Sequence, residues 1–302
     1  MRLKAFIVNR LMPGFIVRWF ARPYVSGDSL EKGVECARKL WLTEGISSTL
    51  DILGEELSTK EDVEKVVITY LDIIEAIKGE KFASISVKPS ALGLDISKDY
   101  CMENLRRILS IGSDAEVNVT MDMESSVYTD VTLGMYRTLK PEFANFGIVL
   151  QTRLFRTKND IQQLKGLNAH VRLCIGIYLE KKEIAYTKKA IMKEKLVEYF
   201  QELHRDGHYC AIATHDDETI RHLLDIIESN GIDHSRLEFQ MLLGVPRREL
   251  QQKLIEKGFV VRLYVPFTTH WRFAIAYLKR RLIENPHMAI YTIRNLFGRL
   301  TQ

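Results

Sequence analysis

Ser48-Thr-Leu-Asp-Ile-Leu53 is a short, mostly apolar run that carries a carboxylate near its end. Similar runs recur along the chain, and long stretches with helical periodicity separate them. The eight expected strands are Ser48–Leu53, Ala83–Val87, Glu116–Met121, Gly147–Leu150, His170–Cys174, Tyr209–Ala213, Leu237–Met241 and Val260–Tyr264. Short apolar runs between helices are typical of parallel strands that are buried on both faces. Eight of them alternating with helices predict an α/β fold, a (β/α)8 TIM-type barrel with extra N-terminal helices.

Nearly every expected strand contains or precedes a polar side chain. These residues are Asp51, Glu55, Lys88, Asp122, Glu124, Gln151, Arg172, His215, Gln240 and Tyr264. In a parallel barrel the C-terminal ends of the strands meet at one mouth, and active sites form there. The pattern therefore predicts an enzyme.

The composition fits one large domain. The chain has 302 residues, of which 46% are hydrophobic and 27% are charged. We expect a single domain over 1–302, with a helical segment at 1–44 and the barrel and C-terminal helices at 45–302. The formal net charge is +4, and Lys and Arg are dispersed, which argues against nucleic-acid binding. Four widely spaced cysteines show neither metal spacing nor a disulfide framework, so a reducing cytoplasm is expected.

The segment 1–25 mixes apolar residues with arginines, which interrupt it too often for a membrane span. It also lacks the core and cleavage site of a signal peptide. We favour an amphipathic helix that packs on the barrel. The alternative is a basic amphipathic segment that contacts a membrane surface from the cytoplasmic side.

Helix signals flank the first strand and recur later. Ser26-Gly-Asp-Ser29 predicts the start of a helix that ends at Gly45. Helical periodicity is also present at Lys60–Lys78, Lys182–Arg205, Asp216–Ser229 and, interrupted by Pro286, Arg272–Phe297.

Several strand-end residues allow more than one chemistry. Lys88 is a candidate Schiff-base amine, a carboxylate ligand or a simple rim lysine. Arg172 lies within an apolar strand, so it needs an anionic partner, either Asp122 or Glu124, or an electron-rich cofactor. Since no histidine has ligand spacing to the two carboxylates, anchoring of cations is favoured over metal binding. His215 is a candidate base, ligand, cofactor contact or ordinary loop histidine.

Tyr277, Arg280 and Arg281 share one face of an expected helix. An aromatic ring beside two guanidinium groups suits a small carboxylate with an apolar body, although a solvated basic face is the alternative. The chain has no Gly-rich dinucleotide fingerprint and no P-loop. A nucleotide cofactor would therefore be held at the barrel mouth.

Nine segments, in this order, resemble the proline dehydrogenase family over about residues 21–285. They are Ala21-Arg-Pro-Tyr-Val25, Leu50-Asp-Ile-Leu-Gly-Glu55, Ile85-Ser-Val-Lys-Pro-Ser90, Met121-Asp-Met-Glu124, Arg172-Leu-Cys-Ile-Gly-Ile-Tyr178, Ala213-Thr-His215, Glu238-Phe-Gln-Met-Leu242, Tyr264-Val-Pro266 and Tyr277-Leu-Lys-Arg-Arg-Leu-Ile-Glu-Asn285. The resemblance implies a distorted (β/α)8 barrel that binds FAD. It also implies oxidation of L-proline to 1-pyrroline-5-carboxylate, the first step of proline catabolism to glutamate, with a membrane quinone as electron acceptor.

The resemblance also implies roles for individual residues, and it implies no metal. The carboxylate clamp comprises Lys88, Arg280 and Arg281. The walls around the proline ring are Leu242, Tyr264 and Tyr277. Arg172 resembles the arginine beside the flavin, and Gln151, Thr214, His215 and Gln240 resemble further cofactor contacts. Glu55 resembles a gate that pairs with Arg280, and Asp122 resembles the carboxylate that orients the clamp. Arg172, Lys88, Asp122 and Tyr264 form the implied catalytic set.

The chain departs from the family pattern at two positions. Ile175 replaces a lysine and Ile177 replaces an alanine, which removes a positive charge and adds bulk near the implied cofactor site. Two other functions stay open. One is a Schiff-base aldolase that uses Lys88. The other, prompted by Ile175, is a flavin- or amino-acid-binding protein with weak turnover.

Overall fold

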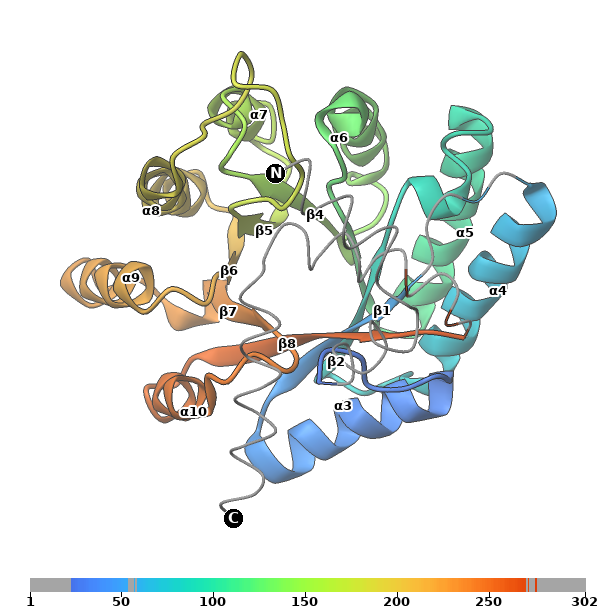
Figure 1. Cartoon of the computed structure of the whole chain (residues 1–302), viewed down its shortest axis with the longest axis horizontal. Coiled ribbons are helices and arrows are strands. Elements are labelled where there is room, and N and C mark those ends of the chain that lie inside the picture. The colour runs from blue at the N-terminus through green and yellow to red at the C-terminus, as the bar shows by residue number, and fades with distance from the viewer. Residues whose placement is uncertain (1–22, 54–56, 58, 270, 272–274, 276–302) are drawn as a thin grey trace, which may run out of the picture.

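The barrel predicted from the sequence is confirmed in the computed structural model, which describes residues 23–53, 57, 59–269, 271 and 275. Eight parallel strands follow one another around a closed ring in chain order, and the last pairs with the first (Figure 1). The strands are β1 (Ser47–Ile52), β2 (Ala83–Val87), β3 (Asn118–Met121), β4 (Phe146–Gln151), β5 (His170–Cys174), β6 (Tyr209–Ala213), β7 (Leu237–Leu242) and β8 (Val260–Phe267).

Two strand ends differ from the prediction by more than one residue. β3 begins at Asn118 because the preceding Glu116 has φ 58°, a left-handed conformation that cannot continue a strand. β8 continues past Tyr264 because its last residues, up to Phe267, pair with the end of β1. This pairing closes the barrel.

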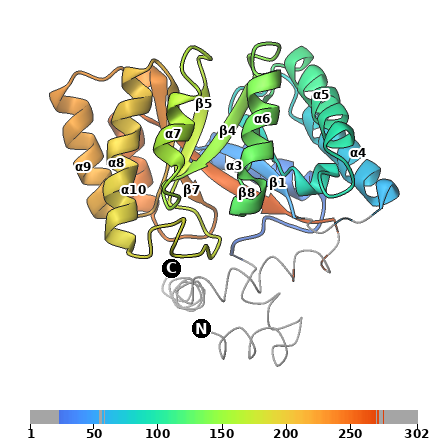
Figure 2. The ribbon, with the colours of Figure 1, turned by 90° about the horizontal axis from the view of Figure 1, so that it is seen from above.

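Helices surround the strands. Those in the described part of the chain are α3 (Leu30–Glu44), α4 (Lys60–Ala76), α5 (Lys98–Asp114), α6 (Thr129–Leu139), α7 (Thr157–Gln162), α8 (Lys189–Arg205), α9 (Asp217–Ser229) and α10 (Arg248–Glu256), with short 3-10 turns at Ser90–Leu92, Ser126–Tyr128 and His234–Arg236. Figure 2 shows α4 and α5 on one side of the barrel and α8 and α9 on the opposite side. None of the helices among these residues is long and apolar enough to cross a membrane.

The helix boundaries follow local chemistry. α3 starts as predicted, because the Ser29 hydroxyl accepts a hydrogen bond from the backbone N–H of Lys32, and it ends at Gly45, which has φ 67°. The predicted start of α8 at Lys182 is wrong by seven residues. The backbone of this segment is instead paired with the loop after β4: Phe155 N–H donates to the carbonyl of Ile184.

The strands divide the core into two regions. Apolar side chains such as Ile85, Val119 and Phe239 are fully buried between the strands and the helices. The residues between them face the opposite way and fill the barrel interior, since strand side chains alternate. Many of these are polar, as in the hydrogen bond of 2.9 Å between the hydroxyls of Thr49 and Ser84. The barrel interior is therefore lined largely by polar side chains, and a layer of apolar side chains between the strands and the helices surrounds it.

Gly45 and Gly134 are expected to respond oppositely to alanine. Neither position has an atom within 4 Å of a new Cβ, so backbone conformation decides the outcome. Gly45→Ala places a side chain at φ 67° and should cost about 1–2 kcal/mol. Gly134→Ala, inside α6, should stabilise by about 0.5–1 kcal/mol. Urea unfolding measures both, and shifts of the same sign would contradict this account.

Candidate active site

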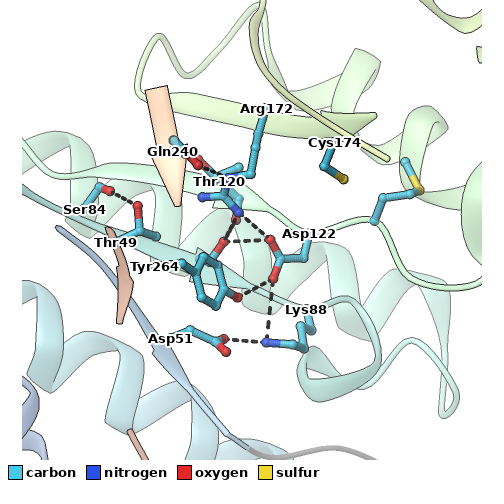
Figure 3. A network of polar contacts seen from close by, with 12 residues as sticks. Thr49, Asp51, Ser84, Lys88, Thr120, Asp122, Arg172, Cys174, Gln240 and Tyr264 are labelled. Carbon is cyan, nitrogen blue, oxygen red and sulfur yellow. Dashed lines mark hydrogen bonds and ion pairs between the residues drawn. The ribbon is translucent and has the colours of Figure 1, made fainter. Parts of the chain in front are cut away.

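Asp122, just after β3, is the centre of a buried polar network at the barrel mouth (Figure 3). Its Oδ1 accepts hydrogen bonds from Arg172 Nη1 at 2.8 Å and from Ser86 Oγ at 2.7 Å. Its Oδ2 accepts one from the Tyr264 hydroxyl at 2.7 Å and lies 3.6 Å from Lys88 Nζ. One carboxylate thus connects side chains from β2, β5 and β8.

Lys88 follows β2 and points inward, as predicted. Its Nζ donates to Asp51 Oδ1, and both side chains are buried. Burial opposes the charged amine, but Asp51, Tyr264 and Asp122 outweigh it and raise the pKa of Lys88 well above its ordinary value. Burial also opposes the charge on Asp122, yet Lys88 and Arg172 hold the pKa of that carboxyl below its usual value. Lys88 therefore stays a cation and Asp122 an anion at neutral pH.

Arg172 is held on two of its three nitrogens. Nη1 contacts Asp122 and Ser86, and Nε donates to Gln240 Oε1 at 2.6 Å. The guanidinium carbon lies 5.2 Å from the centre of the Tyr264 ring, a cation–π contact. The remaining Nη2 is buried and has no hydrogen-bond partner among the described residues. Since a buried unpaired donor is costly, Nη2 marks a place for an acceptor group.

Gln151, at the end of β4, also has a buried polar atom that lacks a hydrogen-bond partner among the described residues. Its Nε2 donates to the carbonyl of Glu124 at 2.8 Å, while its Oε1 has no partner in the part of the chain that the structure describes. Gly176, at φ 91°, lets the next loop approach closely: a Cβ there would lie 2.2 Å from that oxygen. An unpaired donor on β5 and an unpaired acceptor on β4 thus lie on adjacent strands.

The prediction that both acidic residues after the third strand anchor cations is wrong for Glu124. Its carboxylate accepts from the backbone N–H and the hydroxyl of Ser90, at 2.9 and 2.6 Å. Burial raises the pKa of Glu124. This residue connects the turn after β2 to the end of β3, and of the two acidic residues after β3 only Asp122 anchors cations.

The ends of β6 and β7 form another part of the mouth. His215 Nε2 accepts a hydrogen bond from the backbone N–H of Leu242 at 2.8 Å, so this nitrogen is an acceptor. Thr214 is buried, and its backbone N–H donates to the carbonyl of Gln240 at 3.2 Å. Leu242 packs with Tyr24 and Tyr264 in a small apolar cluster. The mouth therefore has an apolar wall beside the charged network.

The structure brings together most of the predicted residues. Glu55, Tyr277, Arg280 and Arg281 lie outside the described residues, so the clamp and the gate stay predictions. Five further residues contribute to the mouth or to the barrel interior beneath it and carry no predicted site role. They are Tyr24, Ser86, Gly176, Glu238 and Arg262. Three of these were detectable: Ser86, Glu238 and Arg262 stand two residues before Lys88, Gln240 and Tyr264, and so share their strand face.

A parallel eight-stranded barrel with a buried ionic network at the strand C-termini defines a (β/α)8-barrel enzyme. The model of one family, proline dehydrogenase, matches residues 35–291. The chain belongs to the proline dehydrogenase family and is an oxidoreductase of that type.

Known relatives agree with this assignment. Proline dehydrogenase 1 of Bacillus subtilis strain 168 is 34% identical over 298 residues, which cover 96% of this chain and 94% of the relative. Proline dehydrogenase of Deinococcus radiodurans is 33% identical, with 91% and 89% covered. The fold matches proline utilization A from Bdellovibrio bacteriovorus inactivated by N-propargylglycine, with TM-score 0.79, 24% identity and 88% of this chain covered. This chain spans 32% of that longer protein.

The Lys88–Asp51 pair gives a stability prediction. Lys88→Met leaves Asp51 buried without its cation and should cost about 3–5 kcal/mol at pH 7. Asp51→Asn/Lys88→Met removes both charges and should recover most of the loss. In the parent, the contribution of Lys88 is fully present below pH 10.5, the ordinary lysine pKa, and is lost as pH rises through the higher folded value. Urea unfolding measures this, and a double variant no more stable than the single one would rule the pairing out.

Proposed function

We propose that this chain oxidises L-proline to 1-pyrroline-5-carboxylate, with FAD at the barrel mouth and a quinone as the final electron acceptor. The observation that carries the proposal is the network around Asp122 in a proline dehydrogenase barrel. This network leaves Arg172 Nη2 and Gln151 Oε1 buried without partners among the described residues. The names of the relatives support proline as the substrate.

The residues present fit a flavin. An isoalloxazine ring has carbonyl and ring-nitrogen acceptors as well as an N–H donor, which match Arg172 Nη2 and Gln151 Oε1. We assign these two residues, together with Thr214, His215 and Gln240, to the cofactor site. FAD supplies the two-electron acceptor when it is bound.

The chain's own side chains would bind and orient the substrate. Lys88 is a fixed cation for the proline carboxylate, and Arg280 and Arg281 complete the clamp that the resemblance implies. Leu242 and Tyr264 offer an apolar wall for the ring. Because Asp122 holds Lys88, Arg172 and Tyr264 through one carboxylate, the substrate and cofactor contacts share one rigid support. Such positioning is a large part of enzymatic rate enhancement.

The two other functions are less well supported. A Schiff-base aldolase needs a neutral amine, whereas Asp51 and Asp122 favour protonated Lys88. A flavin- or amino-acid-binding protein with weak turnover is the alternative prompted by Ile175, which packs against the hydrophobic core. An apolar side chain that packs on the core gives no reason to expect loss of turnover while Arg172 and Asp122 are in place.

The direct test is the absorption spectrum of the purified protein before and after L-proline is added without oxygen. We expect a flavin spectrum that bleaches, and turnover with a dye acceptor. Arg280→Met and Arg281→Met should each raise KM for proline at least about thirtyfold and keep FAD, since breaking a buried charge pair costs about 2–5 kcal/mol. A protein that takes up no flavin, or unchanged KM in both variants, would count against the proposal.

Gly176 gives a separate test of the cofactor site. Gly176→Ala and Gly166→Ala both place alanine at positive φ, 91° and 82°, but only the first meets Gln151 Oε1. We therefore expect similar backbone costs of about 1–2 kcal/mol, with weaker FAD retention in Gly176→Ala alone. Melting temperature and flavin content after dialysis separate the two effects. Equal flavin content would remove Gln151 from the cofactor site.

A further inference from the structure

A second charged pair lies inside the barrel on the N-terminal side of the Asp122 network. Glu238 on β7 is 2% exposed, and Arg262 on β8 donates through Nε to its two carboxylate oxygens at 2.9 and 3.1 Å. Neither residue contacts Asp122 or Lys88 through any hydrogen bond or ion pair that we observe. The pair is nevertheless connected to the site, because Glu238 stands two residues before Gln240 on the same strand face.

Arg262 is itself fixed to the barrel wall. Its Nη1 donates to the carbonyls of Ser48 and Phe82, at 3.0 and 3.3 Å, and lies 3.3 Å from the hydroxyl of Ser84. These partners lie on or beside β1 and β2, whereas Glu238 lies on β7. Arg262, on β8, therefore contacts strands on both sides of its own. The Glu238 carboxylate is therefore held in place by an arginine with several anchors.

Gln240 connects this pair to Arg172. Its Nε2 donates to Glu238 Oε1, and its Oε1 accepts from Arg172 Nε at 2.6 Å. An ionised carboxylate only accepts hydrogen bonds and a guanidinium only donates them. Only one orientation of the amide satisfies both neighbours. A flipped amide would set oxygen against oxygen and N–H against N–H.

We propose that Glu238 is a positioning residue, whose carboxylate, fixed by Arg262, sets the amide orientation of Gln240 and thereby directs Arg172 Nη2 at the cofactor. Arg172 is supported on two of its nitrogens in this arrangement: Asp122 and Ser86 hold Nη1, and Gln240 holds Nε. With both in place its planar group cannot rotate, so Nη2 has one direction. The catalytic consequence rests on the proposed FAD site.

A pair of variants tests the orientation directly. In Glu238→Gln, the amide oxygen takes the place of Oε1, which accepts from both Gln240 Nε2 and Arg262 Nε, so Gln240 keeps its orientation. Glu238→Leu offers no acceptor, so the amide of Gln240 is free to flip and to leave Arg172 Nε without its oxygen. Both variants leave Arg262 facing a neutral side chain, so a purely structural role of the charge pair predicts that they behave alike.

The measurements are the rate of flavin reduction at saturating L-proline, the FAD dissociation constant of reconstituted apoprotein, and the melting temperature. Glu238→Leu should slow reduction about tenfold or more and weaken FAD binding, the loss expected for one hydrogen bond to a charged group. Glu238→Gln should keep both values within about threefold of the parent, while the melting temperature of both variants stays low. The control Glu228→Gln, which removes an exposed pair with Lys257, should match the parent.

Three outcomes would overturn the proposal: parent-like reduction and FAD binding in Glu238→Leu, a Glu238→Gln variant no better than Glu238→Leu, or a Glu238→Gln variant that differs from Glu238→Leu only in melting temperature. If Glu238→Leu does not fold, Gln240→Leu is used instead. It keeps the Glu238–Arg262 pair and should still slow reduction, and a parent-like rate there overturns the proposal too. A parent that takes up no FAD would overturn the proposed function as well. A parent that is reduced by proline, with unaffected variants, overturns only the positioning role.

Discussion

The carboxylate of Asp122 is the constraint on which the rest of the site depends. Two cations, Lys88 and Arg172, and two hydroxyls, Ser86 and Tyr264, converge on its two oxygens. Such convergence is tolerable inside a barrel only because the charges compensate one another, with Asp51 as the second anion. These partners come from three strands, β2, β5 and β8, so the carboxylate also couples the relative positions of the strand ends. Because all four side chains share this carboxylate, we expect a substitution at any one of them to shift the positions of the others.

Much of the fold could be predicted because it depends on local signals. The eight strands were recognisable as short apolar runs, and the limits of α3 follow from a capping serine and a left-handed glycine. The start of α8 could not be predicted, since residues 182–188 have helical composition and their backbone is held by the loop after β4. That contact joins segments far apart in the sequence. The left-handed backbone conformation of Glu116 could not be predicted either, because no local residue preference indicates it.

The site was predictable as a set of residues but only partly as a set of contacts. Strand-end position identified Lys88, Asp122 and Arg172. The pairing of Arg172 with Asp122 was one of three alternatives that the sequence allowed, beside Glu124 and an electron-rich cofactor. Glu124 followed the same alternation yet binds Ser90, because β3 ends before it and the chain turns. Glu238 and Arg262 carried no predicted role, although they share strand faces with the predicted site residues Gln240 and Tyr264. Alternation tells which side chains face inward, while the register between strands decides which of them meet.

The closure of the barrel by β1 and β8 has a consequence for how the chain reaches its folded state. Contacts between the first and last strands run from Ser47 with Arg262 to Ile52 with Phe267, the longest separations in sequence that the sheet contains. During synthesis β1 leaves the ribosome long before β8 exists, and until then it presents an unpaired edge. The polar network is therefore complete only when the strand that carries Tyr264 pairs with β1, and contacts between segments so far apart in sequence are slow to form.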